Sequence, residues 1–146
     1  MMMNKKRIYL DDLRTPIDGD WIIVRSFQEF VDKITEIGIN NISTISLDHD
    51  LGDTAMNEYF TNVKYNYKID YNNIKEKTGL DCAKWLIDHY LETKTDDGQF
   101  EFPTVYTHSA NPIGAANIMG YVNNFLMNMG EQQTCVRVRI QHTVKQ

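Results

Sequence analysis

The sequence predicts an α/β protein built on a three-layer, mostly parallel, five-stranded sheet. Short β-branched or aromatic runs alternate with longer stretches whose apolar residues recur every three or four positions, in the order β-β-α-β-α-β-α-β. Three of these runs end abruptly in polar, reactive side chains, which is typical of the carboxyl edge of a parallel sheet. The 146 residues are enough for one domain with its own core, so we expect a single domain over 1–146.

The first half of the chain contains two strands, a helix and a third strand. We expect strands at Lys6–Leu10 and Trp21–Arg25, joined by a short loop that contains proline and glycine. Ser26 is a suitable N-cap for the helix because an acidic residue follows three positions later, and Gly38 is a natural end. The third strand covers about Ser43–Leu47 and ends in an Asp-His-Asp sequence.

The second half begins with an interruption of this pattern at 53–77. The segment mixes tyrosines, asparagines and both signs of charge, and a loop of this length is often a lid over a binding site. A surface elaboration packed by its own tyrosines is the alternative. Thr78 then opens a second helix, and Thr95–Gln99 is a turn-rich connection. The remaining predicted elements are a strand at Thr104–Thr107, a helix opened by Asn111-Pro112 and a last strand at Cys135–Ile140.

Composition and charge narrow the function classes. The chain carries 15 Lys and Arg against 20 Asp and Glu, a net charge of −5, which disfavours a duplex nucleic-acid binder but allows a small phosphorylated ligand. It has neither a run of about 18 apolar residues nor a signal-peptide pattern, so we expect no membrane span and a cytoplasmic location. Two widely spaced cysteines outside any CxxC pattern suit a reducing compartment.

Three carboxylates at two of the strand ends form a predicted cation site. Asp11 and Asp12 follow the first strand, and Asp48 follows the third. Hard cations such as Mg²⁺ or Mn²⁺ bind through a few carboxylates and keep several waters, so this small acidic cluster suffices. Asp50 can add a ligand or accept a hydrogen bond next to the cation. The alternative is that Asp12 or Asp50 only caps a turn.

Two histidines and an acid are the predicted catalytic residues. His49 lies between Asp48 and Asp50, and His108 follows the fourth strand. Because histidine gives and takes protons near neutral pH, either ring suits phosphate-ester cleavage, and Asp50 is placed beside the first of them. The alternative for each histidine is a structural role, as a ring whose nitrogens are satisfied within the fold.

Three further residues are predicted to hold a phosphate. Ser109 and Asn111 precede the last helix, whose backbone N–H groups and positive dipole end favour anions. Arg14 follows the acidic pair and can bind a phosphate through two parallel hydrogen bonds. Other roles stay open at this point, because Asn111 can act only as a helix cap and Arg14 can simply offset the nearby carboxylates.

Several motifs resemble those of one known family. They are Leu-Asp-Asp-Leu-Arg-Thr-Pro at 10–16, Trp21 with Val24-Arg25-Ser26, Ile-Ser-Leu-Asp-His-Asp-Leu-Gly at 45–52, Thr-Gly-Leu-Asp at 78–81, and His-Ser-Ala-Asn-Pro at 108–112 with Gly114. Over nearly the whole chain except 53–77, this pattern resembles the cyclic-phosphate processing receiver domain family. The resemblance implies a receiver-like or flavodoxin-like sheet, with Asp11, Asp12 and Asp48 in its acidic pocket and Ser109 as its small hydroxyl residue.

The resemblance also implies a function, and two departures from signalling receivers sharpen it. The family acts, by inference, on cyclic phosphates in nucleotide or RNA-end metabolism. The first receiver helix is missing here, because Trp21 follows the acidic pair too soon. The lysine–proline pair that ends the last receiver strand is also missing, because Val136–Ile140 runs into Gln141-His142-Thr143. Its absence disfavours phospho-aspartyl signalling at Asp48.

We therefore expect a metal-dependent phosphoesterase that hydrolyses a small cyclic phosphate or a cyclic-nucleotide-like substrate. One alternative is a non-catalytic sensor or sponge that binds a cyclic nucleotide in the same pocket. A second alternative is a degenerate receiver that acts through protein contacts. The identity of the substrate and the oligomeric state are left open by the sequence.

Overall fold

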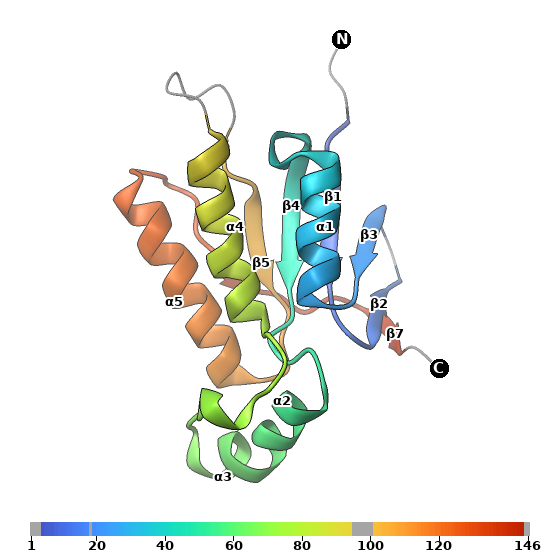
Figure 1. Cartoon of the computed structure of the whole chain (residues 1–146), viewed down its shortest axis with the longest axis vertical. Coiled ribbons are helices and arrows are strands. Elements are labelled where there is room, and N and C mark those ends of the chain that lie inside the picture. The colour runs from blue at the N-terminus through green and yellow to red at the C-terminus, as the bar shows by residue number, and fades with distance from the viewer. Residues whose placement is uncertain (1–3, 18, 95–100, 145–146) are drawn as a thin grey trace.

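A five-stranded sheet forms the centre of the computed structural model, which describes residues 4–17, 19–94 and 101–144 (Figure 1). All of its neighbouring strands pair in parallel, which confirms the predicted sheet. In spatial order the strands are β3 (Trp21–Val24), β1 (Lys6–Leu10), β4 (Ile42–Leu47), β5 (Thr104–Thr107) and β6 (Val136–Arg137). The bounds of β1 and β5 are those that the sequence predicts.

Three long helices cover one face of this sheet. They are α1 (Phe27–Ile37), α4 (Gly79–Thr93) and α5 (Pro112–Asn128), and α4 packs between the other two (Figure 1). Each helix connects two parallel strands, and all three connections run in the same direction along the sheet. Because such crossovers are right-handed, they place their helices on the same face. The structure therefore has one helical layer instead of the two that three layers require.

The opposite face of the sheet is crossed by the end of the chain. The predicted last strand is shortened to β6, after which the backbone leaves the sheet and forms β7 (His142–Val144). This strand pairs in an antiparallel manner with β2 (Arg14–Pro16), a short strand in the loop that follows β1. The loop replaces the missing first helix, as the sequence predicts, and its pairing with β7 holds the terminal segment near the carboxyl edge.

The two faces of the central strands differ in character. Ile8, Ile45 and Val105 are aligned across three strands and belong to the apolar core beneath the helices. The next row along the same strands contains Tyr9, Ser46 and Tyr106. Since side chains alternate along a strand, this row lies on the helix-free face. Polar groups therefore line the face that the chain end crosses.

The 53–77 segment is helical, which corrects its prediction as a loop. It forms α2 (Asp53–Glu58), a π-helical turn η2 (Tyr59–Val63), α3 (Lys64–Asn66) and a 3₁₀ turn η3 (Tyr71–Asn73), below the carboxyl edge in Figure 1. Glu58 is buried and accepts hydrogen bonds from Asn62, Asn73 and the Asp70 amide. Hydrogen bonds to the Glu58 carboxylate therefore hold together a segment that has no regular apolar stripe.

The remaining expectations about the chain concern its cysteines, its membrane contacts and one connection. Cys82 and Cys135 are both buried and free. Among the helices that the structure describes, none has the length and apolar character needed to cross a bilayer. The predicted connection Thr95–Gln99 lies outside the described residues.

Candidate active site

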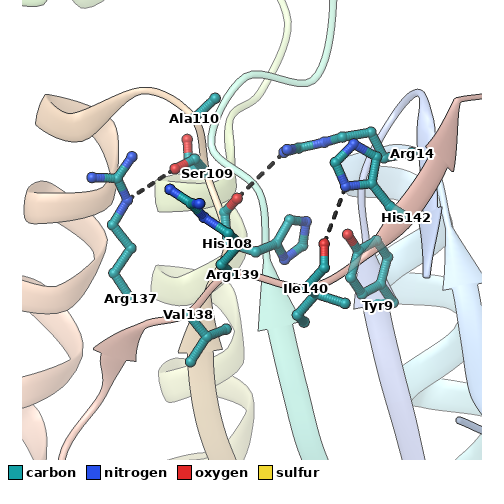
Figure 2. A pocket seen from close by; sticks show the side chains of 10 residues that line it. All are labelled: Tyr9, Arg14, His108, Ser109, Ala110, Arg137, Val138, Arg139, Ile140 and His142. Atoms are coloured by element: carbon teal, nitrogen blue, oxygen red, sulfur yellow. Dashed lines mark hydrogen bonds between the residues drawn. The ribbon is translucent and has the colours of Figure 1, made fainter. Parts of the chain in front are cut away.

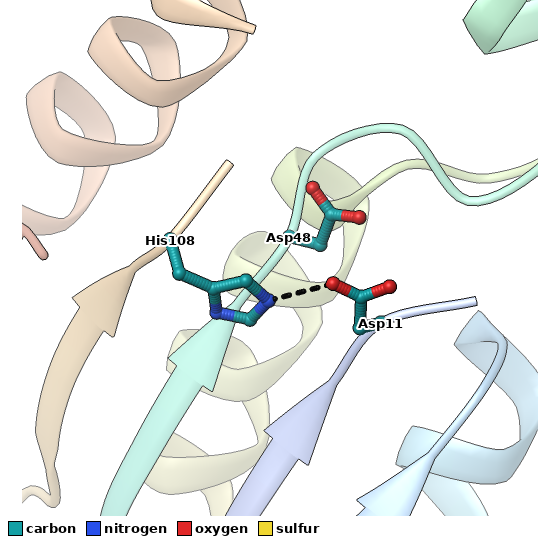
Figure 3. Close-up of side chains that lie close together, drawn as sticks. All are labelled: Asp11, Asp48 and His108. Carbon is teal, nitrogen blue, oxygen red and sulfur yellow. Dashed lines mark hydrogen bonds and ion pairs between the residues drawn. The ribbon is translucent and has the colours of Figure 1, made fainter. Parts of the chain in front are cut away.

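Three side chains from neighbouring strand ends meet at the carboxyl edge of the sheet (Figure 3). Asp11 follows β1, Asp48 follows β4 and His108 follows β5. Each offers one ligand atom, and these atoms all lie within 4.8 Å of one another. All three side chains are buried. Two carboxylates and an imidazole at this separation could hold a metal ion.

The ring of His108 is fixed by contacts on both of its nitrogens and on one face. Nε2 lies 3.1 Å from the Asp11 carboxylate, and Nδ1 lies 2.8 Å from the hydroxyl of Ser46. The ring stacks on Tyr9 with 4.1 Å between centroids and 9° between planes. Ser46 and Tyr9 belong to the polar row on the helix-free face. The strand register therefore sets the orientation of the imidazole.

The carboxylates of the cluster repel one another, and burial adds to the cost of their charges. Burial and the charge of Asp11 raise the pKa of Asp48 to about 8. The same two causes raise the pKa of Asp12 to about 6. Burial also opposes the charge of Asp11, but hydrogen bonds from His108 and from two backbone amides outweigh it and lower the pKa of Asp11. Negative charge concentrated in this way favours a bound cation.

Burial lowers the pKa of His108 in spite of its hydrogen bond to Asp11, so the ring is neutral near pH 7. A neutral imidazole donates from one nitrogen and accepts at the other. Because Nε2 faces a carboxylate, we assign the proton to Nε2, and Nδ1 then accepts from the Ser46 hydroxyl. A cation bound at Nε2 would require the opposite tautomer, which Ser46 can also satisfy by accepting from Nδ1.

Arg14 is the cation nearest to this cluster. Its Nε donates to Asp11 at 2.7 Å, and one terminal nitrogen lies 3.4 Å from Asp48. Arg25 braces the same loop, because it donates to the backbone carbonyls of Asp11 and Arg14. Arg14 therefore offsets the two carboxylates, as one of the predicted alternatives states. Its role in holding a phosphate stays a prediction.

A cavity of about 540 Å³ opens beside the cluster on the helix-free face (Figure 2). Its lining includes Arg14, His108 and Ser109 from the predicted site, Tyr9 from β1, and Arg137 and Arg139 from the end of the chain. Tyr9 is fully buried, and within the described part of the chain its hydroxyl has no hydrogen-bond partner. Burial raises the pKa of Tyr9 to about 12, so this hydroxyl is an unused donor. A ligand oxygen would satisfy it.

His49 lies outside this cavity, in a separate network. Its ring is fully buried, with Nδ1 at 2.6 Å from Asp50 and Nε2 at 3.0 Å from the Tyr71 hydroxyl. A Cβ on Gly114 of α5 would collide with this ring. Asn117 of the same helix donates to the Tyr71 hydroxyl at 2.9 Å. The catalytic roles of His49 and Asp50 stay predictions, because the structure does not bring their side chains to the cavity.

The helix N-terminus beside the cavity is already capped. The Asn111 side chain accepts from the amides of Ile113 and Gly114, and its Nδ2 donates to Asp50. The backbone N–H of Asn111 in turn donates to the Ser109 hydroxyl at 3.1 Å. Ser109 lines the cavity, whereas the polar atoms of the asparagine are used within the fold. Capping therefore accounts for Asn111, and its contact with a phosphate stays a prediction.

The cluster differs from the predicted cation site in one member. His108 takes the place beside Asp11 and Asp48 that the sequence prediction gives to Asp12. Asp12 is half-buried and close enough for the charges of Asp11 and Asp50 to affect its pKa. Sequence reasoning also missed Tyr9 and Ser46. Their signal was alternation, because each is a polar-tipped residue between apolar ones in a buried strand.

Comparison with known proteins agrees with the fold and with these motifs. The profile of the cyclic-phosphate processing receiver domain matches residues 6–124. No curated protein and no solved structure gave a match. The matched range includes the ends of β1, β4 and β5, and therefore Asp11, Asp48 and His108. The chain belongs to the cyclic-phosphate processing receiver domain family.

Proposed function

We propose that this protein is a metal-dependent phosphoesterase that opens a cyclic phosphate. In this reaction a water oxygen forms a bond to phosphorus, one P–O bond of the ring breaks, and the leaving oxygen takes a proton. The observation that supports the proposal is the meeting of Asp11, Asp48 and His108, of which His108 lines a ligand-sized cavity. The family is associated with cyclic-phosphate processing, which agrees with this chemistry.

A divalent cation, Mg²⁺ or Mn²⁺, fits the cluster because two of the three donors are carboxylates. Its charge would polarise the phosphoryl oxygens and lower the pKa of a water molecule. The raised pKa of Asp48 supports the same conclusion, since a bound cation would offset the repulsion from Asp11. Arg14 would stay in contact with both carboxylates and face the cavity at the same time.

The substrate is held, in this proposal, by three groups that line the cavity. Arg14 contributes positive charge next to the cation, and Ser109 contributes a hydroxyl group. Tyr9 offers the donor that has no partner within the described part of the chain. Hydrogen bonds to charged phosphate oxygens are stronger than those between neutral groups. These contacts would orient the ring phosphate before it reacts.

His108 can serve this reaction in two ways, which differ in the proton at Nε2. As a general acid or base, it would exchange that proton with water or with the leaving oxygen. As a metal ligand, it would keep Nε2 unprotonated and donate from Nδ1 to Ser46, the kind of outer contact that orients ligating histidines. We favour the ligand role because Nε2 lies 3.1 Å from Asp11, within the three-residue cluster.

Two other functions use the same pocket. A sensor or sponge would bind the cyclic phosphate through the same groups and release it unchanged. A degenerate receiver would instead accept a phosphoryl group at Asp48. The buried ion pair of Arg14 with Asp11 and Asp48 disfavours the latter, because the attacking carboxylate is held by an arginine.

The test is a screen of nucleoside 2′,3′-cyclic phosphates and 3′,5′-cyclic nucleotides with Mg²⁺ or Mn²⁺, read by the phosphomonoester products. We expect turnover that a chelator abolishes and added cation restores. Tight binding of one compound without any turnover would favour the sensor. Labelling of Asp48 by acetyl phosphate, lost in Asp48→Asn, would favour the degenerate receiver.

A further inference from the structure

We propose that the cavity holds a second phosphate of the ligand on Arg137 and Arg139, so that the preferred ligand is a cyclic phosphate carrying another phosphate group. This inference rests on the proposed function, because it assumes that the cyclic phosphate lies at the cluster of Asp11, Asp48 and His108. It adds the substrate class and names two residues that determine specificity.

The charge of the cavity is the first observation. The chain as a whole has a net charge of −5, yet the described lining contains three arginines, two histidines and no carboxylate. The carboxylates of Asp11 and Asp48 lie next to this lining and interact with Arg14. The positive charges of Arg137 and Arg139 are therefore left over after the acidic cluster is accounted for. An anionic ligand group is the natural partner for them.

The second observation is that both arginines are exposed and that most of their donors have no partner among the described residues. Nε of Arg137 donates to the Ser109 carbonyl at 3.1 Å, which holds the side chain at the cavity (Figure 2). Within the described part of the chain, neither guanidinium makes an ion pair, and Arg139 makes no side-chain hydrogen bond. A guanidinium presents its donors as a planar fork that matches two phosphate oxygens.

The third observation is that the backbone holds both arginines in place. On one side, β6 pairs with β5, and the amide of Val138 continues this pairing to the Thr107 carbonyl at 2.8 Å. On the other side, β7 pairs with β2. Arg137 and Arg139 both line the cavity, together with Val138 between them. A site fixed at both ends loses little conformational entropy when the ligand binds.

The size of the cavity and the location of the arginines complete the argument. A volume of about 540 Å³ suits a ligand of nucleotide size. Figure 2 shows Arg137 on the left of the view and Arg14 on the right, with Ser109 and His108 between them. Both added arginines follow the family match, which ends at residue 124. The second phosphate site is thus formed by the C-terminal segment that lies beyond the matched range.

The experiment compares two probes in the presence of Mn²⁺: adenosine 2′,3′-cyclic phosphate and the same compound with a 5′-phosphate. Equilibrium binding by calorimetry is measured beside turnover. We expect the 5′-phosphorylated probe to bind about a hundredfold more tightly, with about tenfold from each arginine, as for hydrogen bonds to charged groups. Arg137→Gln and Arg139→Gln should each remove about tenfold of this preference, taken as the ratio of the two affinities within each variant.

The matched control is Arg7→Gln, which removes a half-buried arginine that stacks on Trp21 and does not line this cavity. It should leave the preference intact. Thermal unfolding checks that each variant folds, and Arg137→Lys should keep part of the preference because it keeps the charge. A dinucleotide that ends in a cyclic phosphate, whose internal phosphodiester supplies the second phosphate, distinguishes an oligonucleotide end from a mononucleotide. A preference for either doubly phosphorylated compound supports the inference.

Failure of this inference and failure of the proposed function give different results. Equal binding of the probes with and without the second phosphate would overturn the second site, even if turnover is seen. A preference that depends on Arg137 and Arg139, without turnover of any probe, would support the second site and overturn the phosphoesterase. Absence of binding by all three compounds would overturn both.

Discussion

His108 and His49 each follow a central strand, and each ring has both nitrogens within hydrogen-bond distance of a partner. Their surroundings differ in what is left unsatisfied. Around His108, two carboxylates repel each other and a buried tyrosine hydroxyl lacks a partner among the described residues. Around His49, Asp50 bonds to the ring and to the helix cap Asn111, and the Tyr71 hydroxyl bonds to the ring and to Asn117. The first network leaves groups that a ligand could satisfy, whereas in the second each side chain named has its partners within the fold.

This difference shows how one sheet edge can carry both a site and its support. The network of His49, Asp50 and Tyr71 connects the strand end to the 53–77 segment and to α5. Asn111 joins the two regions, because it bonds to Asp50 on one side and to Ser109 on the other. We infer that the second network positions Ser109 and the start of α5 beside the cavity. The predictions below test this division of roles, from the largest effect to the smallest.

Asp48→Asn should have the largest effect on the cavity side. Neutralising one of the two carboxylates in the cluster removes a charge that would contact the cation. Affinity for Mn²⁺ should therefore fall by more than roughly a hundredfold, beyond the loss seen when a residue that only bonds to a ligand is changed. Calorimetric titration of the folded variant measures this. Asp88→Asn, on the exposed side of α4, is the matched control and should bind Mn²⁺ like the wild type. Unchanged affinity in Asp48→Asn would remove the metal from the proposed function.

The pair His108→Ala and His49→Ala compares the two networks directly. His108→Ala should lower turnover by about 10²–10⁴-fold, the usual size of an acid–base contribution, and in the favoured ligand role it should also weaken Mn²⁺ binding. His49→Ala removes a fully buried ring and its hydrogen bonds to Asp50 and Tyr71, which keep their bonds to Asn111 and Asn117, so it should mainly lower the free energy of unfolding, by about 1–3 kcal/mol.

Steady-state kinetics, Mn²⁺ titration and denaturant unfolding of both variants separate these outcomes. Unchanged Mn²⁺ affinity with lost turnover in His108→Ala would assign that ring to proton transfer, as predicted from the sequence. Equal losses of turnover in the two variants, at unchanged stability, would contradict the comparison and support a catalytic role for His49.

The part of the site that the sequence predicts best depends on local pattern. Short β-branched runs that end in Asp11, Asp48 and His108 are visible in the sequence, and parallel strands bring such ends together. Capping chemistry likewise identifies Ser26, whose side chain accepts from the Glu29 amide. In each of these cases the residues within a few positions identify the strand end or the cap, and the parallel order of the strands then brings the strand ends together.

The remainder depends on contacts between distant segments. Tyr71 reaches His49 across 22 positions, and nothing in either local pattern connects them. The pairing of β7 with β2 joins the two ends of the chain and converts a predicted straight last strand into a wall of the cavity. The alternation of Arg137 and Arg139 is visible in the sequence. That they line the cavity follows only from the path of the chain between β6 and β7.

Because of Asp48, the affinity of the cluster for a cation should depend on pH. The pKa of Asp48 is raised to about 8, above its value of about 3.9 in an unfolded chain, so the carboxyl is protonated at neutral pH without a cation. Binding must then release a proton, and apparent Mn²⁺ affinity should rise about tenfold per pH unit between 6 and 8. Calorimetry in two buffers of different ionisation enthalpy measures the released proton.

The same shift fixes the sign of the effect on stability. Because the folded pKa lies above the unfolded one, Asp48 stabilises the metal-free fold fully below about pH 4, and this contribution is lost as pH rises to 8. Added Mn²⁺ should therefore raise the melting temperature more at pH 8 than at pH 6. Asp48→Asn should lose this difference, and a wild type whose Mn²⁺ affinity is constant from pH 6 to 8 would contradict the shift.

The smallest effect is expected on the free energy of unfolding, from substitutions at two glycines of α5, Gly114 and Gly120. A Cβ at Gly114 would collide with the His49 ring, whereas a Cβ at Gly120 meets nothing within 4 Å. Gly114→Ala should therefore destabilise the fold by about 1–3 kcal/mol through overpacking, and Gly120→Ala should stabilise it by up to about 1 kcal/mol through helix propensity. Both variants should keep wild-type Mn²⁺ affinity, since neither position touches Asp11, Asp48 or His108. If Gly114→Ala lost the cation while remaining folded, the His49 network would belong to the metal site itself, and the two regions would have to be treated as one.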